Sequence, residues 1–171
     1  MAAEVLSSII PIHLQALQSL RRHHGEEKSM GSQVTLDKWQ EEWTKADGVA
    51  SWTKRLIPDV RKWYQRKHGW MSYHLSQLLS GHGSAREGLY RCGFVRSPLC
   101  LFCREVDTTE HAFFKCKMFN GERSYLDQRW GPVTPDNVVE KMLSDIQCWN
   151  DIEEYAKAVV ASKDTWRASV V

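Results

Sequence analysis

Three cysteines and one histidine near the middle of the chain have the spacing of metal ligands. Cys100, Cys103, His111 and Cys116 form a C-x2-C-x7-H-x4-C pattern within 17 residues. Zn²⁺ prefers thiolate and imidazole ligands in a tetrahedral arrangement. Because protein side chains would fill all four positions, no position remains for a reactive water molecule. The pattern therefore predicts one structural Zn²⁺; the alternative is a chance grouping of these residue types.

No other group of residues is typical of an enzyme. The sequence contains no glycine-rich phosphate loop, no G-x-S-x-G turn and no carboxylate cluster for two metal ions. Cys92 is either a spare ligand or a small buried side chain, and Cys148 fits helix packing. A hydrolase that uses His82 is the remaining catalytic alternative. We expect a protein that is not an enzyme and has no small-molecule substrate.

The composition is typical of a globular protein that needs no disulfides. The chain has 171 residues, of which 42% are hydrophobic and 26% charged, so it fits one domain or two small lobes. Its five cysteines favour a reducing compartment with metal-bound thiolates. The opening MAAEVLSSIIPIHL lacks a basic signal-peptide region, and no apolar run approaches the ~20 residues of a membrane span. We expect an intracellular protein of the nucleus or cytoplasm, without membrane contact.

Helical signals dominate the first half of the chain. Residues 2–24 are expected to form a helix broken at Pro11, with an apolar stripe that includes Ile12 and Leu20, and residues 26–34 a polar linker. Thr35 is a candidate cap for a helix that carries Trp39 and Trp43. Further short helices are expected after Pro58, over residues 70–80 up to Gly81, and through Leu89.

The second half supplies further helices around the metal loop. Thr108 or Thr109 is expected to cap the turn that presents His111, Thr134-Pro135-Asp136 to open a helix, and a final helix to start near Trp149. These signals predict a mainly α fold: a small helical domain with one zinc-ordered loop. We expect an N-terminal segment and linker (1–34), a tryptophan-rich basic region (35–96), the zinc loop (97–120) and C-terminal helices (121–171), all in one compact unit.

Charge is distributed unevenly although the net charge is only +2. Between Lys54 and His68, six lysines and arginines accompany one acid, Asp59, and they interleave with aromatic residues that include Trp63 and Trp70. Cations neutralise phosphates and aromatic faces stack on unpaired bases, so this stretch is a candidate nucleic-acid interface. The alternative is that the aromatics form the core and the cations are merely solvated. Residues 136–154 are acidic, which fits a solvated helix face.

Residues along the whole chain resemble one family segment. They include Trp52-Thr53, Leu56-Ile57-Pro58-Asp59-Val60, His68-Gly69, Gln77, Gly81-His82-Gly83, the four metal ligands with Glu110, and Asn137-Val138-Val139. The series resembles the C-terminal, post-polymerase segment of the reverse-transcriptase polyprotein of arthropod non-LTR retrotransposons. The chain would then be an excised segment, a truncated copy or a co-opted copy of such an element.

The resemblance implies a module that helps to hold template RNA or target DNA during target-primed reverse transcription, without the catalytic polymerase palm or an endonuclease. The expected cofactor is one structural Zn²⁺, and the expected partner is single-stranded or structured RNA or DNA. The candidate nucleic-acid-binding residues are Arg55, Arg61, Lys62, Trp63, Arg66, Lys67 and His82.

The sequence also departs from the family pattern. Ser76 and Ser80 stand where threonines are usual, Ser51 stands where a basic residue is common, and residues 84–88 differ. The alternative function is therefore a co-opted protein-interaction module in which zinc is only a scaffold. The altered 84–88 segment and the acidic C-terminal helices favour that alternative.

Overall fold

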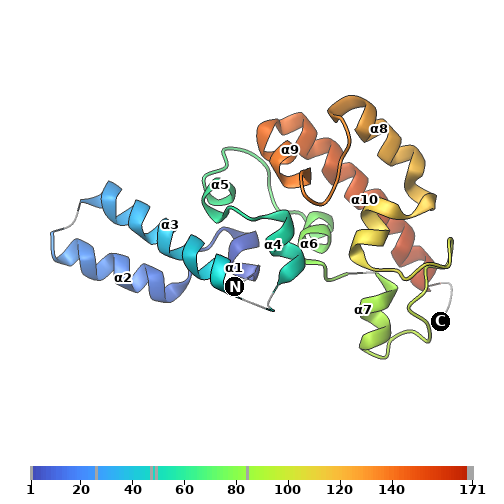
Figure 1. Cartoon of the computed structure of the whole chain (residues 1–171), viewed down its shortest axis with the longest axis horizontal. Coiled ribbons are helices and arrows are strands. Elements are labelled where there is room, and N and C mark those ends of the chain that lie inside the picture. The colour runs from blue at the N-terminus through green and yellow to red at the C-terminus, as the bar shows by residue number, and fades with distance from the viewer. Residues whose placement is uncertain (1, 26, 47, 49, 84, 169–171) are drawn as a thin grey trace. The chain divides into compact units, whose positions relative to one another are not determined.

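The computed structural model describes residues 2–25, 27–46, 48, 50–83 and 85–168, the side chains of residues 167 and 168 excepted. Ser84, in the segment 84–88 that departs from the family pattern, lies outside the described residues. Within these ranges all regular elements are helices, and one isolated antiparallel bridge joins Leu99 to Val106 (Figure 1). The predicted mainly α fold is confirmed. No helix in the described ranges is long and apolar enough to cross a membrane.

The chain divides into two compact units, one of residues 1–67 and one of residues 68–171. A single compact unit is expected from the sequence, and the division falls inside the predicted 35–96 region. Gly69, just after the division, adopts a φ of +86° and precedes the first helix of the second unit.

Unit 1 is built around the tryptophans of α3. It contains α1 (Ala2–Ser7), α2 (Ile12–His23), α3 (Lys28–Lys45), α4 (Ser51–Leu56) and α5 (Val60–Tyr64). Helix α3 packs against α2 and α5, and α1 packs against α5. Trp39 and Trp43 are fully buried together with Trp63, as expected of two aromatics spaced four residues apart on one helix face.

Three expectations for unit 1 are wrong in detail. The predicted linker 26–34 is helical from Lys28, and Glu26 lies outside the described residues. Thr35 lies inside this helix, where its hydroxyl donates to the Gly31 carbonyl at 2.7 Å, so it caps nothing. In α2 the buried residue is Leu14, whereas Ile12 is 77% exposed, because the side that faces α3 is partly polar. There Gln18 Nε2 donates to Ser32 Oγ at 3.1 Å.

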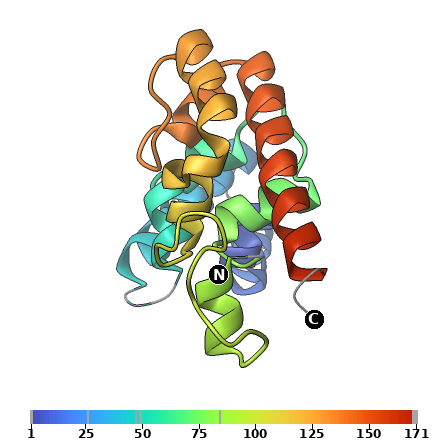
Figure 2. The ribbon, with the colours of Figure 1, turned by 90° about the vertical axis from the view of Figure 1, so that its right-hand side faces the viewer.

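Unit 2 is organised around its last helix. It contains α6 (Tyr73–Ser80), α7 (Arg86–Arg91), a π-helical turn η1 (His111–Lys115), a 3₁₀ turn η2 (Lys117–Phe119), α8 (Asn120–Trp130), α9 (Val138–Ser144) and α10 (Ile146–Ala168). Helix α10 packs against α6, α8, α9 and η1, and Figure 2 shows it running alongside α8. Leu75, Met142 and Ile152 belong to the core between these helices.

Two predicted helix starts in unit 2 are displaced by a few residues. Thr134-Pro135-Asp136 precedes a turn in which Asn137 Oδ1 accepts from the Thr134 amide at 2.9 Å, and α9 begins only at Val138. The last helix begins at Ile146 because Asp145 accepts from the amides of Gln147 and Cys148, which provides an earlier cap than the one expected near Trp149.

Candidate metal centre and nucleic-acid residues

The four predicted metal ligands converge in unit 2. One ligand atom each from Cys100, Cys103, His111 and Cys116 lies within 4.8 Å of the other three. Cys100 Sγ and Cys116 Sγ are 3.8 Å apart. Two sulfurs bound to one tetrahedral zinc at about 2.3 Å would lie about 3.8 Å apart. The geometry and the donor set both fit a metal ion of zinc type.

The first two ligands lie on a tight loop. The Leu99–Val106 bridge closes its base, the Cys100 amide donates to the Glu105 carbonyl at 2.8 Å, and the Arg104 amide donates to the Cys100 carbonyl at 3.1 Å. Arg104 has a φ of +63°, an uncommon conformation for a non-glycine residue. This turn brings Cys100 and Cys103 to the same side of the loop, as the x2 spacing predicts.

The other two ligands lie at the ends of one wide helical turn. The Thr108 hydroxyl accepts from the His111 amide at 2.9 Å, which confirms the predicted cap. The Cys116 amide then donates to the His111 carbonyl at 2.7 Å, a five-residue spacing typical of a π-helical turn. This wide turn places the Cys116 thiol near the His111 imidazole, although four residues separate them in the sequence.

The two ring nitrogens of His111 have different neighbours. Nε2 lies 3.1 Å from Cys103 Sγ, while Nδ1 lies 3.4 Å from Glu105 Oε2. A carboxylate at the second nitrogen fixes the orientation and tautomer of a metal-binding histidine. Glu105 is not recognisable from the sequence pattern, because only the folded loop places it beside the ring.

The environment of the centre perturbs the acidity of its ligands. Burial lowers the pKa of His111, so the ring is in its neutral, metal-binding form near pH 7. Burial also raises the pKa of the Cys116 thiol to about 12. At Cys100 burial acts in the same direction, but hydrogen bonds from the Cys103 and Phe102 amides outweigh it and the pKa of this thiol is lowered. The Cys100 thiol is therefore more easily deprotonated for binding than the Cys116 thiol.

A buried ion pair fixes the loop to α10. Lys163 Nζ lies 2.6 and 2.8 Å from the two carboxylate oxygens of Asp107, and both side chains are almost fully buried. Asp107 also accepts from the Arg86 amide at 3.0 Å, which ties the start of α7 to the same point. The two charged residues are 56 positions apart, and no sequence pattern links them.

The remaining cysteines lie outside the centre. Cys148 is buried, as its predicted packing role requires. Cys92 is exposed, and it does not belong to the group of ligand atoms. The expectation of a small buried side chain at Cys92 is wrong, because the residue follows the last turn of α7 at the surface.

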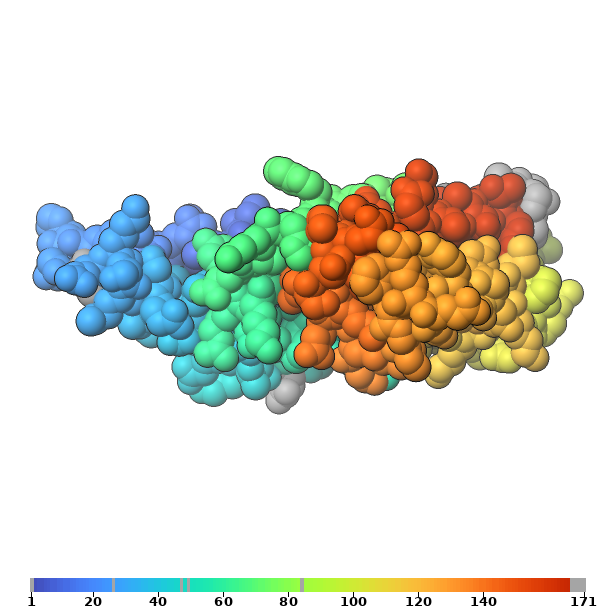
Figure 3. Space-filling model, turned by 90° about the horizontal axis from the view of Figure 1, so that it is seen from above, coloured from blue at the N-terminus to red at the C-terminus, as the bar shows by residue number. Residues whose placement is uncertain are grey.

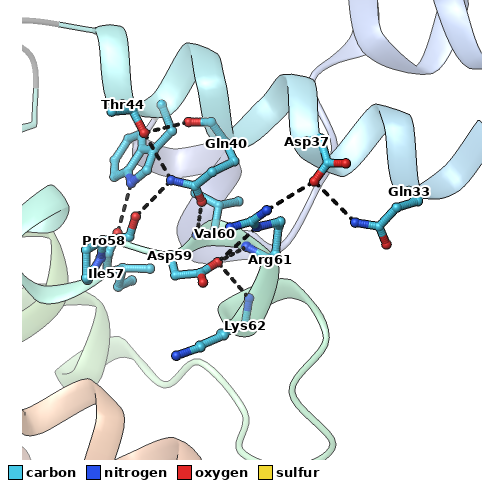
Figure 4. Close-up of polar contacts among 11 residues, drawn as sticks. Gln33, Asp37, Gln40, Thr44, Ile57, Pro58, Asp59, Val60, Arg61 and Lys62 are labelled. Carbon is cyan, nitrogen blue, oxygen red and sulfur yellow. Dashed lines mark hydrogen bonds and ion pairs between the residues drawn. The ribbon is translucent and has the colours of Figure 1, made fainter.

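The predicted phosphate contact Arg61 has acidic neighbours in unit 1. Its Nη1 lies 3.1 Å from Asp37 Oδ1, and its Nε lies 3.5 Å from Asp59 Oδ1 (Figure 4). Asp59 at the same time caps α5 by accepting from the Arg61 and Lys62 amides. Figure 4 shows that Gln40 fixes this region by contacts with Pro58 and Val60. A phosphate would therefore have to compete with two carboxylates for the Arg61 guanidinium.

Two further predicted contacts have structural roles in unit 1. Trp63 is fully buried and donates from Nε1 to the Val5 carbonyl at 2.8 Å, so the prediction that it stacks on bases is wrong. The guanidinium of Arg66 lies 4.4 Å from the centre of the Trp63 ring and donates to the Trp63 carbonyl at 2.8 Å. Burial lowers the pKa of Arg66.

The other residues predicted to bind nucleic acid are exposed. Arg55, Lys62 and Lys67 are at the surface of unit 1. His82 is exposed in unit 2, where its Nδ1 lies 3.0 Å from the Ser80 carbonyl oxygen. Trp70, the alternative stacking residue, is 91% exposed.

In the described residues, fold and site together define a helical module with a Cys3His metal-binding group. The chain is distantly similar to Pol polyproteins of R1 retrotransposable elements from insects. The "Retrovirus-related Pol polyprotein from type-1 retrotransposable element R1 4" of Nasonia vitripennis is 26% identical over 141 residues, which cover 69% of this chain and 36% of that protein. The corresponding R1 polyprotein of Bradysia coprophila is 29% identical over 90 residues, which cover 52% of this chain and 9% of that protein.

The predicted resemblance to this class of polyprotein is therefore confirmed as a distant similarity. The chain spans about a third of one relative and about a tenth of the other. No family model matches the sequence, and no solved structure matches this chain.

Proposed function

We propose that this chain is a non-catalytic nucleic-acid-binding module that one Zn²⁺ stabilises. The observation that carries the proposal is the convergence of four soft donor atoms within 4.8 Å in a chain similar to retrotransposon Pol polyproteins. Three thiolates and one imidazole suit zinc and fill its tetrahedral shell, so the metal has a structural role.

Exposed cations support the nucleic-acid part of the proposal. Arg55, Lys62 and Lys67 are at the surface of unit 1, and the indole of Trp70 is exposed in unit 2. Cations at a surface attract phosphates and release counterions, and an exposed indole offers a face to an unpaired base. Arg61 contributes less than its charge suggests because Asp37 and Asp59 neutralise it locally.

The test is binding of the zinc-loaded protein to single-stranded RNA, single-stranded DNA and duplex at two salt concentrations. Affinity is expected to fall as salt rises, and the variant K62Q/K67Q is expected to lower the slope by about 0.7 per lost phosphate contact on a single strand. The matched control K45Q/K157Q neutralises two exposed lysines that lie beside Glu41 and Glu154. Absence of binding at low salt would overturn the proposal.

One observation favours protein interaction as the second candidate function. A groove of about 660 Å³ between α8 and α10 is lined by Glu122, Asp151 and Glu154 and by the exposed Tyr125. Figure 3 shows α8 and α10 adjoining at this surface. An acidic groove with an aromatic side chain suits a basic peptide. Binding of an Arg-rich peptide that E122Q/E154Q abolishes, without nucleic-acid binding at low salt, would favour this function.

A further inference from the structure

A second groove of unit 2 lies between the Gly81-His82-Gly83 turn and α7. Its volume is about 460 Å³, and its walls include His82, Thr109, Arg91 and Phe94. Sites for small organic ligands occupy about 300–1,000 Å³ and combine apolar walls with a few polar groups. The groove is therefore large enough for one nucleotide.

The glycines of the turn are explained by folding alone. Gly81 adopts a φ of +73° and ends α6 in the left-handed conformation that favours glycine. A Cβ atom on Gly83 would lie 2.2 Å from Oε1 of the buried Gln77, so a side chain there would force Gln77 to move. His82 between them is exposed, and burial does not account for it.

The His82 ring is held in one orientation. Its backbone amide donates to the Ser80 hydroxyl at 3.1 Å, and its Nδ1 lies 3.0 Å from the Ser80 carbonyl oxygen. A carbonyl oxygen only accepts hydrogen bonds, so Nδ1 carries a proton and Nε2 of the neutral ring is an acceptor. A ligand group that donates a hydrogen bond can be recognised here.

The opposite wall offers a cation and an aromatic face. Phe94 is 77% exposed, and its backbone is fixed by a hydrogen bond from its amide to the Leu89 carbonyl at 2.9 Å. The Arg91 side chain is 75% exposed, and its Nη1 lies 3.9 Å from Glu87 Oε1. At that distance and exposure the contact is weak, so a phosphate can compete for the guanidinium.

We propose that this groove binds one unpaired nucleotide of a single strand. Phe94 stacks on the base, Arg91 pairs with the phosphate, and His82 Nε2 accepts a hydrogen bond from the sugar 2′-hydroxyl or a base amino group. The proposal rests on the nucleic-acid-binding function above and assigns a subsite to it. The charge of Arg91 and the exposed ring of Phe94 in one groove complement a nucleotide, whose phosphate is anionic and whose base is planar.

The experiment measures binding of 12-nucleotide single strands to the zinc-loaded full chain, with 2-aminopurine as the stacking probe. F94A is expected to weaken binding about 5- to 150-fold and to abolish the fluorescence quenching that stacking causes. R91Q is expected to lower the salt slope by about 0.7. Y90A and R96Q are matched controls, because they alter exposed residues of the same unit that do not line the groove; less than a twofold change is expected.

The outcomes separate the subsite from the general function. If the unsubstituted protein binds no strand, the proposed function itself fails. If it binds but F94A and R91Q behave like Y90A and R96Q, the groove assignment is overturned while the function stands. H82A should weaken binding of RNA more than DNA if the 2′-hydroxyl is the donor, and of both equally if a base amine is. No effect on either strand would remove His82 from the subsite. Circular dichroism and zinc content verify that each variant is folded.

Discussion

Two thiols of the candidate metal centre, Cys100 and Cys116, do not lose their protons with equal ease. The pKa of Cys116 is raised to about 12 by burial, whereas amide hydrogen bonds keep that of Cys100 low. A thiol with such a high pKa is protonated at neutral pH unless a metal ion displaces the proton. Binding of a metal ion therefore requires the Cys116 thiol to lose its proton, and this links metal binding to closure of the loop.

Loss of one ligand should release the metal and open the loop. The variant C103S is expected to lose stoichiometric zinc and to unfold at least residues 97–120, because the remaining ligands cannot complete a tetrahedron. Zinc content by mass spectrometry and amide hydrogen exchange over this range provide the measurement.

Cys92 provides the matched control for this prediction, because its thiol is exposed and lies outside the ligand group. C92S should retain one zinc per chain and unchanged exchange rates. Retained zinc and an unchanged melting curve in C103S would show that the four residues do not form a metal centre.

The Asp107–Lys163 pair should contribute more to folding than any surface ion pair of unit 2. Both side chains are almost fully buried, so K163M removes the cation that pairs with Asp107 and leaves its carboxylate beside the Arg86 amide. Removal of one member of a buried pair costs about 3–5 kcal/mol. Urea unfolding of the zinc-loaded protein measures the loss.

The control for K163M lies on the same helix. Lys157 is exposed and lies 3.5 Å from Glu154, so K157M should change the free energy of unfolding by less than about 1 kcal/mol. Similar losses for the two variants would mean that the buried pair contributes no more than a surface pair.

At the scale of the elements, local signals predict most helix ends and tertiary contacts decide the rest. Pro11 separates α1 from α2 and Gly81 ends α6, as expected, because each restricts the backbone without help from other elements. The start of α3 at Lys28 is not predictable from polarity, because the segment is stabilised by packing against α2.

Some residues of the candidate site are likewise predictable from local sequence, and others depend on tertiary contacts. The metal ligands follow from spacing within a single loop, so the sequence contains the full signal. The assignment of Trp63 to a nucleic-acid surface fails because the Val5 carbonyl that accepts from it lies 58 positions away. Glu105 and the Asp107–Lys163 pair are likewise visible only once the chain has folded.

The Gly69 turn should tolerate no side chain. Its φ of +86° disfavours other residues, and a Cβ atom would lie 2.3 Å from the indole ring of Trp149. The left-handed conformation costs about 1–2 kcal/mol, and displacement of a buried ring adds a further 1–3 kcal/mol. G69A should therefore lower the free energy of unfolding by about 3 kcal/mol in urea titration.

A comparison with Gly93 separates the cost of the backbone conformation from the cost of displacing the Trp149 ring. It also has a positive φ, of +76°, but no atom lies within 4 Å of an added Cβ. G93A should cost only the conformational part, about 1–2 kcal/mol. If the two variants lose equal stability, the contact between Gly69 and Trp149 does not restrict this turn.

At the scale of the whole molecule, the two units depend differently on the metal. All four ligands belong to unit 2, while unit 1 has its own core of Trp39, Trp43 and Trp63. Zinc binding to small sites provides about 10–16 kcal/mol, comparable to or larger than the 5–15 kcal/mol that typically stabilises a domain. Removal of the metal should therefore affect one unit selectively.

Chelation with EDTA should abolish hydrogen-exchange protection of residues 97–120 and weaken that of α10, which packs against the metal-bearing turn η1. Protection of α3 and α5 should remain, because their contacts lie within unit 1. Exchange measured by mass spectrometry before chelation, after it and after zinc is restored tests this, and restored zinc should return the original pattern. Equal loss of protection in both units would mean that the chain unfolds as one cooperative body. Selective loss would show that the metal stabilises unit 2 and not unit 1.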